Sequence, residues 1–245
     1  MPFEAHDGAA TVPLVGPARA TSLVDDSLGR VIRRLALPAV ASNVLMTIFA
    51  SVDAFWVGTR IGARGLAAVS TAVFWIWMVI ALAEMVSVGL TAVAARRHGE
   101  RRSEEAAHVV GETLVFAIAL GALVGVVGAA LVDRLFALMH TPPDVTVLGR
   151  SYLRVYFLGA PLIYGYFAID ASFRAAGDTR TPFALLLVST VCTLVLDPVL
   201  ILGLAGAPRL GIVGAAIALV LTRGGACIAG LLLLRRRGML RLNRF

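Results

Sequence analysis

Six long apolar runs divide this chain, and each of them can cross a lipid bilayer as a helix. A helix of about 20 apolar residues spans the ~30 Å hydrocarbon core of a membrane. Of the 245 residues, 59% are hydrophobic and 15% are charged, whereas soluble domains are about 45–50% apolar and about 25% charged. The sequence therefore predicts an all-α, polytopic membrane protein in which residues 31–245 form one six-helix transmembrane lobe, with spans at about 35–57, 66–95, 109–132, 151–173, 182–204 and 211–234.

The arginines predict the direction of these spans. Fifteen lie in the amino-terminal tail, in the loops after the second and fourth spans and at the carboxy-terminal end, and six lie on the opposite side. Because cytoplasmic loops carry the excess of basic residues, we expect both termini in the cytoplasm and Arg60 and Arg209 in external loops. Residues 1–30 are expected to form a disordered cytoplasmic tail. Topology accounts for the net charge of +7, so no nucleic-acid partner is expected.

Two carboxylates lie deep inside the spans, Asp53 in the first and Asp197 in the fifth, whereas Glu84, Glu112 and Asp170 lie toward the cytoplasmic ends of their helices, where water and lipid headgroups solvate them. An acid at such a place costs at least ~2.5 kcal/mol on insertion scales, which makes it a candidate functional residue by default. At 1.5 Å per residue, Asp53 lies about 27 Å and Asp197 about 22 Å from the cytoplasmic start of its helix. Since the first and fifth helices run in the same direction, both acids reach the outer half of the membrane and can face one cavity.

Polar residues precede these acids at helical spacing. Thr190 and Thr193 share a face with Asp197, and Ser42 shares a face with Asp53 through Met46 and Ala50, because positions three, four and seven apart lie on one side of a helix. We expect these residues to line a cavity for the coupling ion and the substrate. Pro198 removes a backbone hydrogen bond beside the acid, so a helix kink is expected there.

A second kink is expected at Pro38 in the first span. Arg223 lies near the middle of the sixth span and is a possible charge partner for the cavity: it pairs with an acid, faces a water-filled groove or extends to the membrane surface. Cys192 and Cys227 have no ligand neighbours at metal-binding spacing. The sequence also shows no set of residues typical of a catalytic nucleophile or a cofactor site. The sequence therefore predicts no enzyme, no metal site and no cofactor.

The third span carries a row of glycines. Gly121, Gly125 and Gly128 give a face of small residues, a pattern that in membranes most often means close helix packing.

At the residues around the two acids the chain resembles the multidrug and toxic compound extrusion (MATE) family of antiporters, with its DNA-damage-inducible F type as the expected branch. The first helix, LALPAVASNVLMTIFASVDAFWVGTRIGARGLAAVS, is similar to the opening helix of that family, with its proline, its acid and the following Val57 and Gly58. The segment FRAAGDTRTP resembles the loop before the fifth helix, and LDPVLILG and GIVGAAIALVLTR resemble the end of the fifth helix and the start of the sixth. The resemblance covers about residues 30–240.

The resemblance implies a cation-coupled antiporter that exports drugs or other amphipathic organic compounds, with Asp53 and Asp197 as the coupling groups. Thr193 stands where that branch commonly has Asn, and Leu219 stands where it commonly has Thr. Because both departures remove oxygen ligands that a sodium ion prefers, H⁺ is the favoured coupling ion, and Na⁺ stays possible.

The family has twelve helices in two lobes, and this chain resembles the amino-terminal lobe alone. We therefore expect a truncated gene, a fragment or a half-transporter completed by another chain. Its expected partners are a small-molecule substrate, the lipid bilayer and either a second six-helix lobe or a second copy of itself, and its expected location is the bacterial inner membrane. Two alternatives stay open: a flippase for lipid-linked precursors from the same superfamily, and a transport-inactive lobe that acts as an interaction subunit.

Overall fold

The computed structural model describes residues 28–206 and 208–241, with the backbone alone for residues 28–36, 38, 39, 53 and 205. Long apolar runs form helices here because a helix satisfies its own backbone hydrogen bonds, which lipid cannot do. Within the described range the chain folds into seven α-helices and one short 3₁₀ helix, and no strand is found: α1 Leu28–Arg60, α2 Ala63–Gly99, α3 Ser103–Leu138, α4 Pro143–Leu158, α5 Ala160–Ala175, α6 Arg180–Leu202, η1 Leu204–Gly206 and α7 Ile212–Arg236.

These helices supply five membrane spans, or six if the bent pair α4–α5 forms one span. Five helices are long and apolar enough to cross a bilayer on their own, and α4 and α5 are so only together, with a bend of 53° between them. Large apolar side chains such as Phe74 and Val126 point outward, 72% and 68% exposed, as suits a surface that faces lipid. The predicted fold class, an all-α, multi-pass membrane lobe, is confirmed.

The single helix expected over residues 151–173 is wrong, because the chain breaks at Gly159 between α4 and α5. Pro161 has no backbone N–H and cannot donate to the carbonyl of Phe157, four residues earlier. Gly159 packs directly on α7, where a Cβ would lie 2.3 Å from the side chain of Val220. The apolar run continues through this break, so hydropathy alone did not reveal it.

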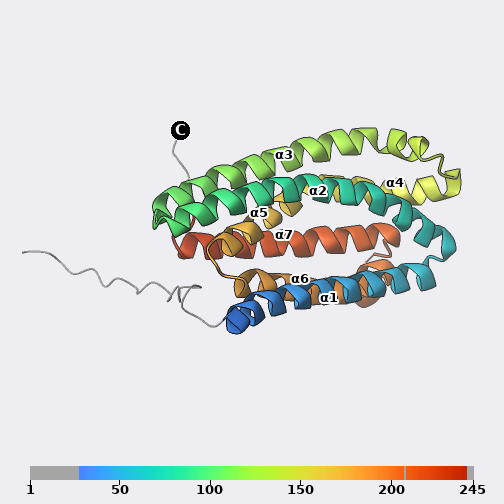
Figure 1. Cartoon of the computed structure of the whole chain (residues 1–245). Coiled ribbons are helices and arrows are strands. Elements are labelled where there is room, and N and C mark those ends of the chain that lie inside the picture. The colour runs from blue at the N-terminus through green and yellow to red at the C-terminus, as the bar shows by residue number, and fades with distance from the viewer. Residues whose placement is uncertain (1–27, 207, 242–245) are drawn as a thin grey trace, which may run out of the picture.

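The helices lie side by side along one axis, and their connections alternate between two ends (Figure 1). The start of α1, the turns α2–α3 and α5–α6 and the end of α7 share one end, which we call the proximal end. The connections α1–α2, α3–α4 and α6–α7 share the other, the distal end. α1 packs mainly on α6, and α6 packs on α7. α7 in turn packs on α4 and α5, and α2 and α3 cover the other side of the α4–α5 pair. The two acid-bearing helices, α1 and α6, are therefore neighbours.

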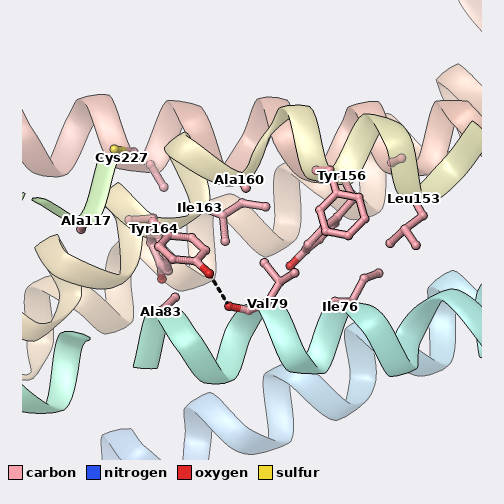
Figure 2. Packing of buried hydrophobic residues seen from close by; sticks show 14 of the residues in the cluster. Ile76, Val79, Ala83, Ala117, Leu153, Tyr156, Ala160, Ile163, Tyr164 and Cys227 are labelled. Carbon is pink, nitrogen blue, oxygen red and sulfur yellow. Dashed lines mark hydrogen bonds between the residues drawn. The ribbon is translucent and has the colours of Figure 1, made fainter. Parts of the chain in front are cut away.

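A central part of the core lies between α2 and the bent pair α4–α5 (Figure 2), and α3 and α7 add further buried side chains to it. The hydroxyl group of Tyr164 donates a hydrogen bond of 2.9 Å to the backbone carbonyl of Val79 across this contact. Around it, apolar side chains of α2 pack against α4 and α5: Ile76, Ala83, Leu153, Tyr156 and Ile163.

The glycine face of α3 packs on the break between α4 and α5. A Cβ at Gly125 would lie 2.5 Å from the backbone oxygen of Phe157, and one at Gly121 would lie 2.9 Å from that of Ala160. At Gly128 it would lie 2.3 Å from the ring of Phe157. The expected close packing of the three glycines is therefore confirmed.

The turn between α5 and α6 lies within the segment FRAAGDTRTP and ties three helices together at the proximal end. Asp178 accepts hydrogen bonds of 3.0 Å from the backbone amides of Arg180 and Thr181, and so caps α6. Arg237, just beyond α7, reaches the same carboxylate at 2.6 Å and lies over the ring of Phe173 in α5. Burial raises the pKa of Asp178, but the hydrogen bonds from Thr181 and Arg237 lower it by more, so this pKa lies below its ordinary value.

Candidate functional site

A buried polar stripe runs along α6. Asp197 is fully buried at 0% exposure, and Thr190 and Thr193 are each 2% exposed. Ser189, which sequence reasoning did not include, is also buried and lies one turn before Thr193. The i, i+3 and i+4 spacing explains the stripe, because it places all four side chains on one side of the helix. Burial of this much polarity in an apolar helix is expensive, which supports a functional reading.

The stripe is joined to α7 through a pair of threonines. The Oγ1 atoms of Thr193 and Thr222 lie 2.7 Å apart, and both hydroxyl groups also lie within hydrogen-bond distance of a carbonyl on their own helix, Ser189 at 2.8 Å and Ala218 at 2.9 Å. A hydroxyl group has one proton to donate. One threonine therefore donates across the helix pair, and the other donates to its own carbonyl.

Thr222 is a second site residue that sequence reasoning missed. Leu219 offers no oxygen ligand, but Thr222 lies one turn further along and brings a hydroxyl group against Thr193. The spacing between positions 219 and 222 was the available signal. The register between α6 and α7, which no single-helix pattern gives, decides that this hydroxyl reaches the stripe.

On α1, the described part of the predicted cavity is Ser42, which is half-buried. The side chains of Asp53 and Pro38 lie outside the described residues, so the expected contact between the two acids and the expected kink at Pro38 stay predictions. Pro198 lies inside α6, four residues before the helix ends at Leu202. Its kink, too, stays a prediction.

A cavity of about 440 Å³ opens at the distal end between α1 and α6. Ile201, one turn beyond Asp197 on α6, forms part of its wall. The guanidinium Nε of Arg209 donates to the carbonyl of Leu202 at 3.1 Å, and Arg60 lies over the ring of Trp56 at 5.9 Å. The cavity is therefore a mouth at the end of the α1–α6 seam, with two arginines at its rim. Its lining residues are Thr59, Arg60, Ile61, Ile201, Leu202, Arg209 and Gly211.

Arg223 lies inside the bundle. Its side chain reaches from α7 toward α1, where Nη2 donates to the sulfur of Met46 at 3.5 Å, and over the ring of Tyr166 in α5 at 5.0 Å. Among the described residues it forms no ion pair, so the expected pairing with an acid of the cavity stays a prediction. Asp170 on α5 is already bound to Arg174, with Nε to Oδ2 at 2.7 Å.

The described residues contain no group of three His, Cys, Asp or Glu side chains that could hold a metal ion. Cys227 is buried, and a Cβ at Gly165 would lie 2.9 Å from its sulfur, so this cysteine acts as a small packing residue. The arrangement that remains is a pair of adjacent helices, a fully buried acid with hydroxyl groups beside it, and a mouth at one end. Such a set can hold and release a proton or another small cation.

Comparison with known proteins agrees with this architecture. The MatE family pattern matches residues 38–199. The chain is 34% identical over 211 residues to the probable multidrug resistance protein YoeA of Bacillus subtilis strain 168, which covers 86% of this chain and 46% of that protein. It is 26% identical over 205 residues to the DNA damage-inducible protein F of Escherichia coli strain K12, covering 82% of this chain and 43% of that protein. A solved MOP superfamily transporter from Pyrococcus furiosus has a TM-score of 0.81 at 27% identity and covers 90% of this chain and 48% of that one. The chain thus spans about half the length of the relatives it matches.

Proposed function

Because the chain belongs to the MatE family, we propose that it forms the amino-terminal six-helix lobe of an antiporter that exports drugs or other amphipathic organic compounds. Membership confirms the resemblance to the MATE family, and the similarity to protein F agrees with the expected branch. The relatives are transporters, which agrees with a non-enzymatic role. The single observation that carries the proposal is Asp197, fully buried in a helix that packs along α1.

The proposed coupling ion is H⁺, carried by Asp53 and Asp197. A carboxyl group inside a membrane protein exchanges a proton with whichever side of the membrane its cavity faces, and its charge decides whether a cationic cargo is held or released. Thr190 and Thr193 lie on the same face as Asp197 and keep polar groups beside it. The Thr193–Thr222 pair supplies hydroxyl oxygens as well, so coupling to Na⁺ is the alternative that the experiment below includes.

The proposed unit contains a second six-helix lobe or a second copy of this chain. Each relative is about twice as long as the matching region. The proposed location is the bacterial inner membrane with both termini in the cytoplasm, so the proximal end faces inward. Single cysteines at Ala63 and Ser103 test this orientation with an impermeant thiol reagent on intact cells. We expect the reagent to label position 63 alone. Labelling of position 103 alone would show that the lobe has the opposite orientation.

Dye efflux in inverted membrane vesicles tests the function. Vesicles carrying this lobe together with a carboxy-terminal lobe, and vesicles carrying this chain alone, are compared under a pH gradient and then under a sodium gradient. Efflux driven by the pH gradient is expected for the completed pair. Efflux that requires sodium and does not respond to the pH gradient would show that Na⁺, and not H⁺, is the coupling ion. No efflux from any combination would favour the transport-inactive lobe.

A flippase for lipid-linked precursors is the second candidate. Such a protein needs cationic side chains inside its cavity to hold phosphate groups. Among the described residues Arg223 is the only buried arginine, so one such side chain is present where a flippase would need several.

A further inference from the structure

Arg223 is a buried positive charge whose hydrogen-bonding groups are only partly used. The residue is 9% exposed, and it lies about 16 Å from the start of α7, near the middle of the span. Its Nη1 atom is buried and has no hydrogen-bond partner among the described residues. Since a charged group inside a membrane is expensive and usually has a partner or a role, this side chain requires an explanation.

Its two neighbours hold the guanidinium group in place without neutralising it. Met46 accepts a contact of 3.5 Å from Nη2 through its sulfur, and a thioether is a weak acceptor. The ring of Tyr166 lies 5.0 Å from Cζ, a distance that favours a cation on the ring face. Both contacts leave the positive charge in place.

A carboxylate on the same side of α5 is already occupied. Asp170 lies one turn beyond Tyr166, and Arg174 binds it through Nε at 2.7 Å and Nη2 at 3.3 Å. Within the described range no acid forms an ion pair with Arg223. Met46, which covers the guanidinium group, is itself 43% exposed at the surface of the lobe, and its flexible side chain can move aside.

We propose that Arg223, Tyr166 and Met46 form a binding subsite for the carboxylate of an amphipathic organic anion. Displacement of the Met46 sulfur frees Nη2, so that Nη1 and Nη2 together bind both oxygens of the carboxylate in the fork geometry that arginine prefers. The ring of Tyr166 fixes the plane of the guanidinium group, and the thioether and ring contact the apolar part of the ligand. As an element of cargo selection the subsite rests on the proposed export function, but as a binding site it stands on these three residues.

Fluorescence titration of the chain in nanodiscs tests the subsite without any ion gradient. The probes are dansylglycine, which carries a carboxylate, and dansylglycinamide, which is neutral and has nearly the same shape. We expect the anion to bind about tenfold more tightly than the amide, as one charge-assisted pair implies. In Arg223→Gln this preference should disappear, whereas Arg235→Gln, which removes an exposed arginine at the end of the same helix, should keep it.

Two further measurements separate binding from folding. Arg223→Gln should unfold at the same temperature as the parent or higher, because it removes a buried charge that lacks an ion-pair partner among the described residues. Arg223→Lys keeps the charge and should keep a preference for the anion with several-fold weaker binding. Equal binding of both probes to the parent, unchanged preference in Arg223→Gln, or loss of preference in Arg223→Lys would overturn the proposal. Because no transport is measured, a lobe that binds the anion through Arg223 but exports nothing would refute the export function alone.

Discussion

Thr193 on α6 and Thr222 on α7 lie with their hydroxyl oxygens 2.7 Å apart, four residues along α6 from the fully buried Asp197. This contact fixes the register of the two helices at the depth of the polar stripe. Both hydroxyl groups also have a carbonyl on their own helix within reach. The pair therefore has two arrangements of its protons, and either one leaves the helices joined.

Replacing either threonine with valine should weaken the lobe by breaking this link. Interhelical hydrogen bonds in membranes contribute about 0.6–1.7 kcal/mol, so Thr193→Val and Thr222→Val are each expected to lose roughly that much. The double variant should lose less than the sum of the two, because both changes remove the same bond. Reversible unfolding in mixed micelles gives the numbers. Thr91→Val, whose hydroxyl group bonds only to the carbonyl of Ser87 on its own helix, serves as the control. Strict additivity of the two losses would show that the contact contributes nothing.

Asp178 should make stability depend on pH at the proximal end. Its pKa in the folded chain lies below the ordinary value of 3.8, so its contribution is present above about pH 4 and is lost as the pH falls through the lower, folded value. We expect Asp178→Asn to unfold more easily than the parent at pH 7 by about 1 kcal/mol, because asparagine still accepts from the backbone amides but loses the negative charge that Arg237 binds at 2.6 Å, and a hydrogen bond to a charged group is stronger by about that much. The two should converge as the pH is lowered toward 3, and thermal unfolding across this range measures the convergence.

Asp144→Asn is the matched control for that measurement. Asp144 forms an exposed ion pair of 3.1 Å with Arg64 at the distal end, and exposed pairs contribute little. A loss at pH 7 as large as that of Asp178→Asn would mean that the capped turn has no special role.

Adding one methyl group at Gly125 should destabilise the contact between α3 and the break. A Cβ there would lie 2.5 Å from the backbone oxygen of Phe157, which cannot rotate away, whereas a Cβ at Gly89 in α2 meets nothing within 4 Å. Overpacking typically costs about 1–3 kcal/mol, so Gly125→Ala should lower the unfolding free energy by that amount. Gly89→Ala should leave it unchanged or raise it by up to about 1 kcal/mol, since alanine favours the helix. Equal effects of the two changes would contradict the close approach.

The coupling role of the acids predicts a sharp difference among carboxylates. In vesicles that carry a completed transporter, Asp53→Asn and Asp197→Asn should each abolish efflux driven by a pH gradient. Insertion and folding should be nearly unchanged, because asparagine keeps the size and removes a buried charge. Glu84→Gln and Asp170→Asn should retain most of the parental rate. If both asparagine variants transport like the parent, the acids of α1 and α6 are not the coupling groups.

Hydropathy predicted the helices well, because a run of about 20 apolar residues has few alternatives in a membrane. The helix ends were less predictable. α2 continues through Arg96 and Arg97 to Gly99, and basic side chains at such ends extend beyond the apolar core. The break at Gly159 was missed because the residues on both sides are apolar. Pro161, placed two residues after a glycine, was the local signal.

The candidate site was predictable only along each helix. Spacing within α6 placed Thr190, Thr193 and Asp197 on one face, and the structure buries all three. The contacts made by Thr222 and Arg223 depend on how α7 is aligned against α6, α5 and α1. That alignment is decided by packing between helices, which no period of 3.6 residues encodes.

The break between α4 and α5 also has a consequence for how relatives of this chain diverge. Pro161 leaves the carbonyl of Phe157 without its usual donor, and α3 can approach that oxygen only because position 125 carries no side chain. A relative that replaced the proline would regain an N–H for this carbonyl and straighten the span, and the constraint on the glycine would then be relaxed. Positions 125 and 161, distant in sequence, are therefore expected to change together during evolution and to be retained together wherever the bend is kept.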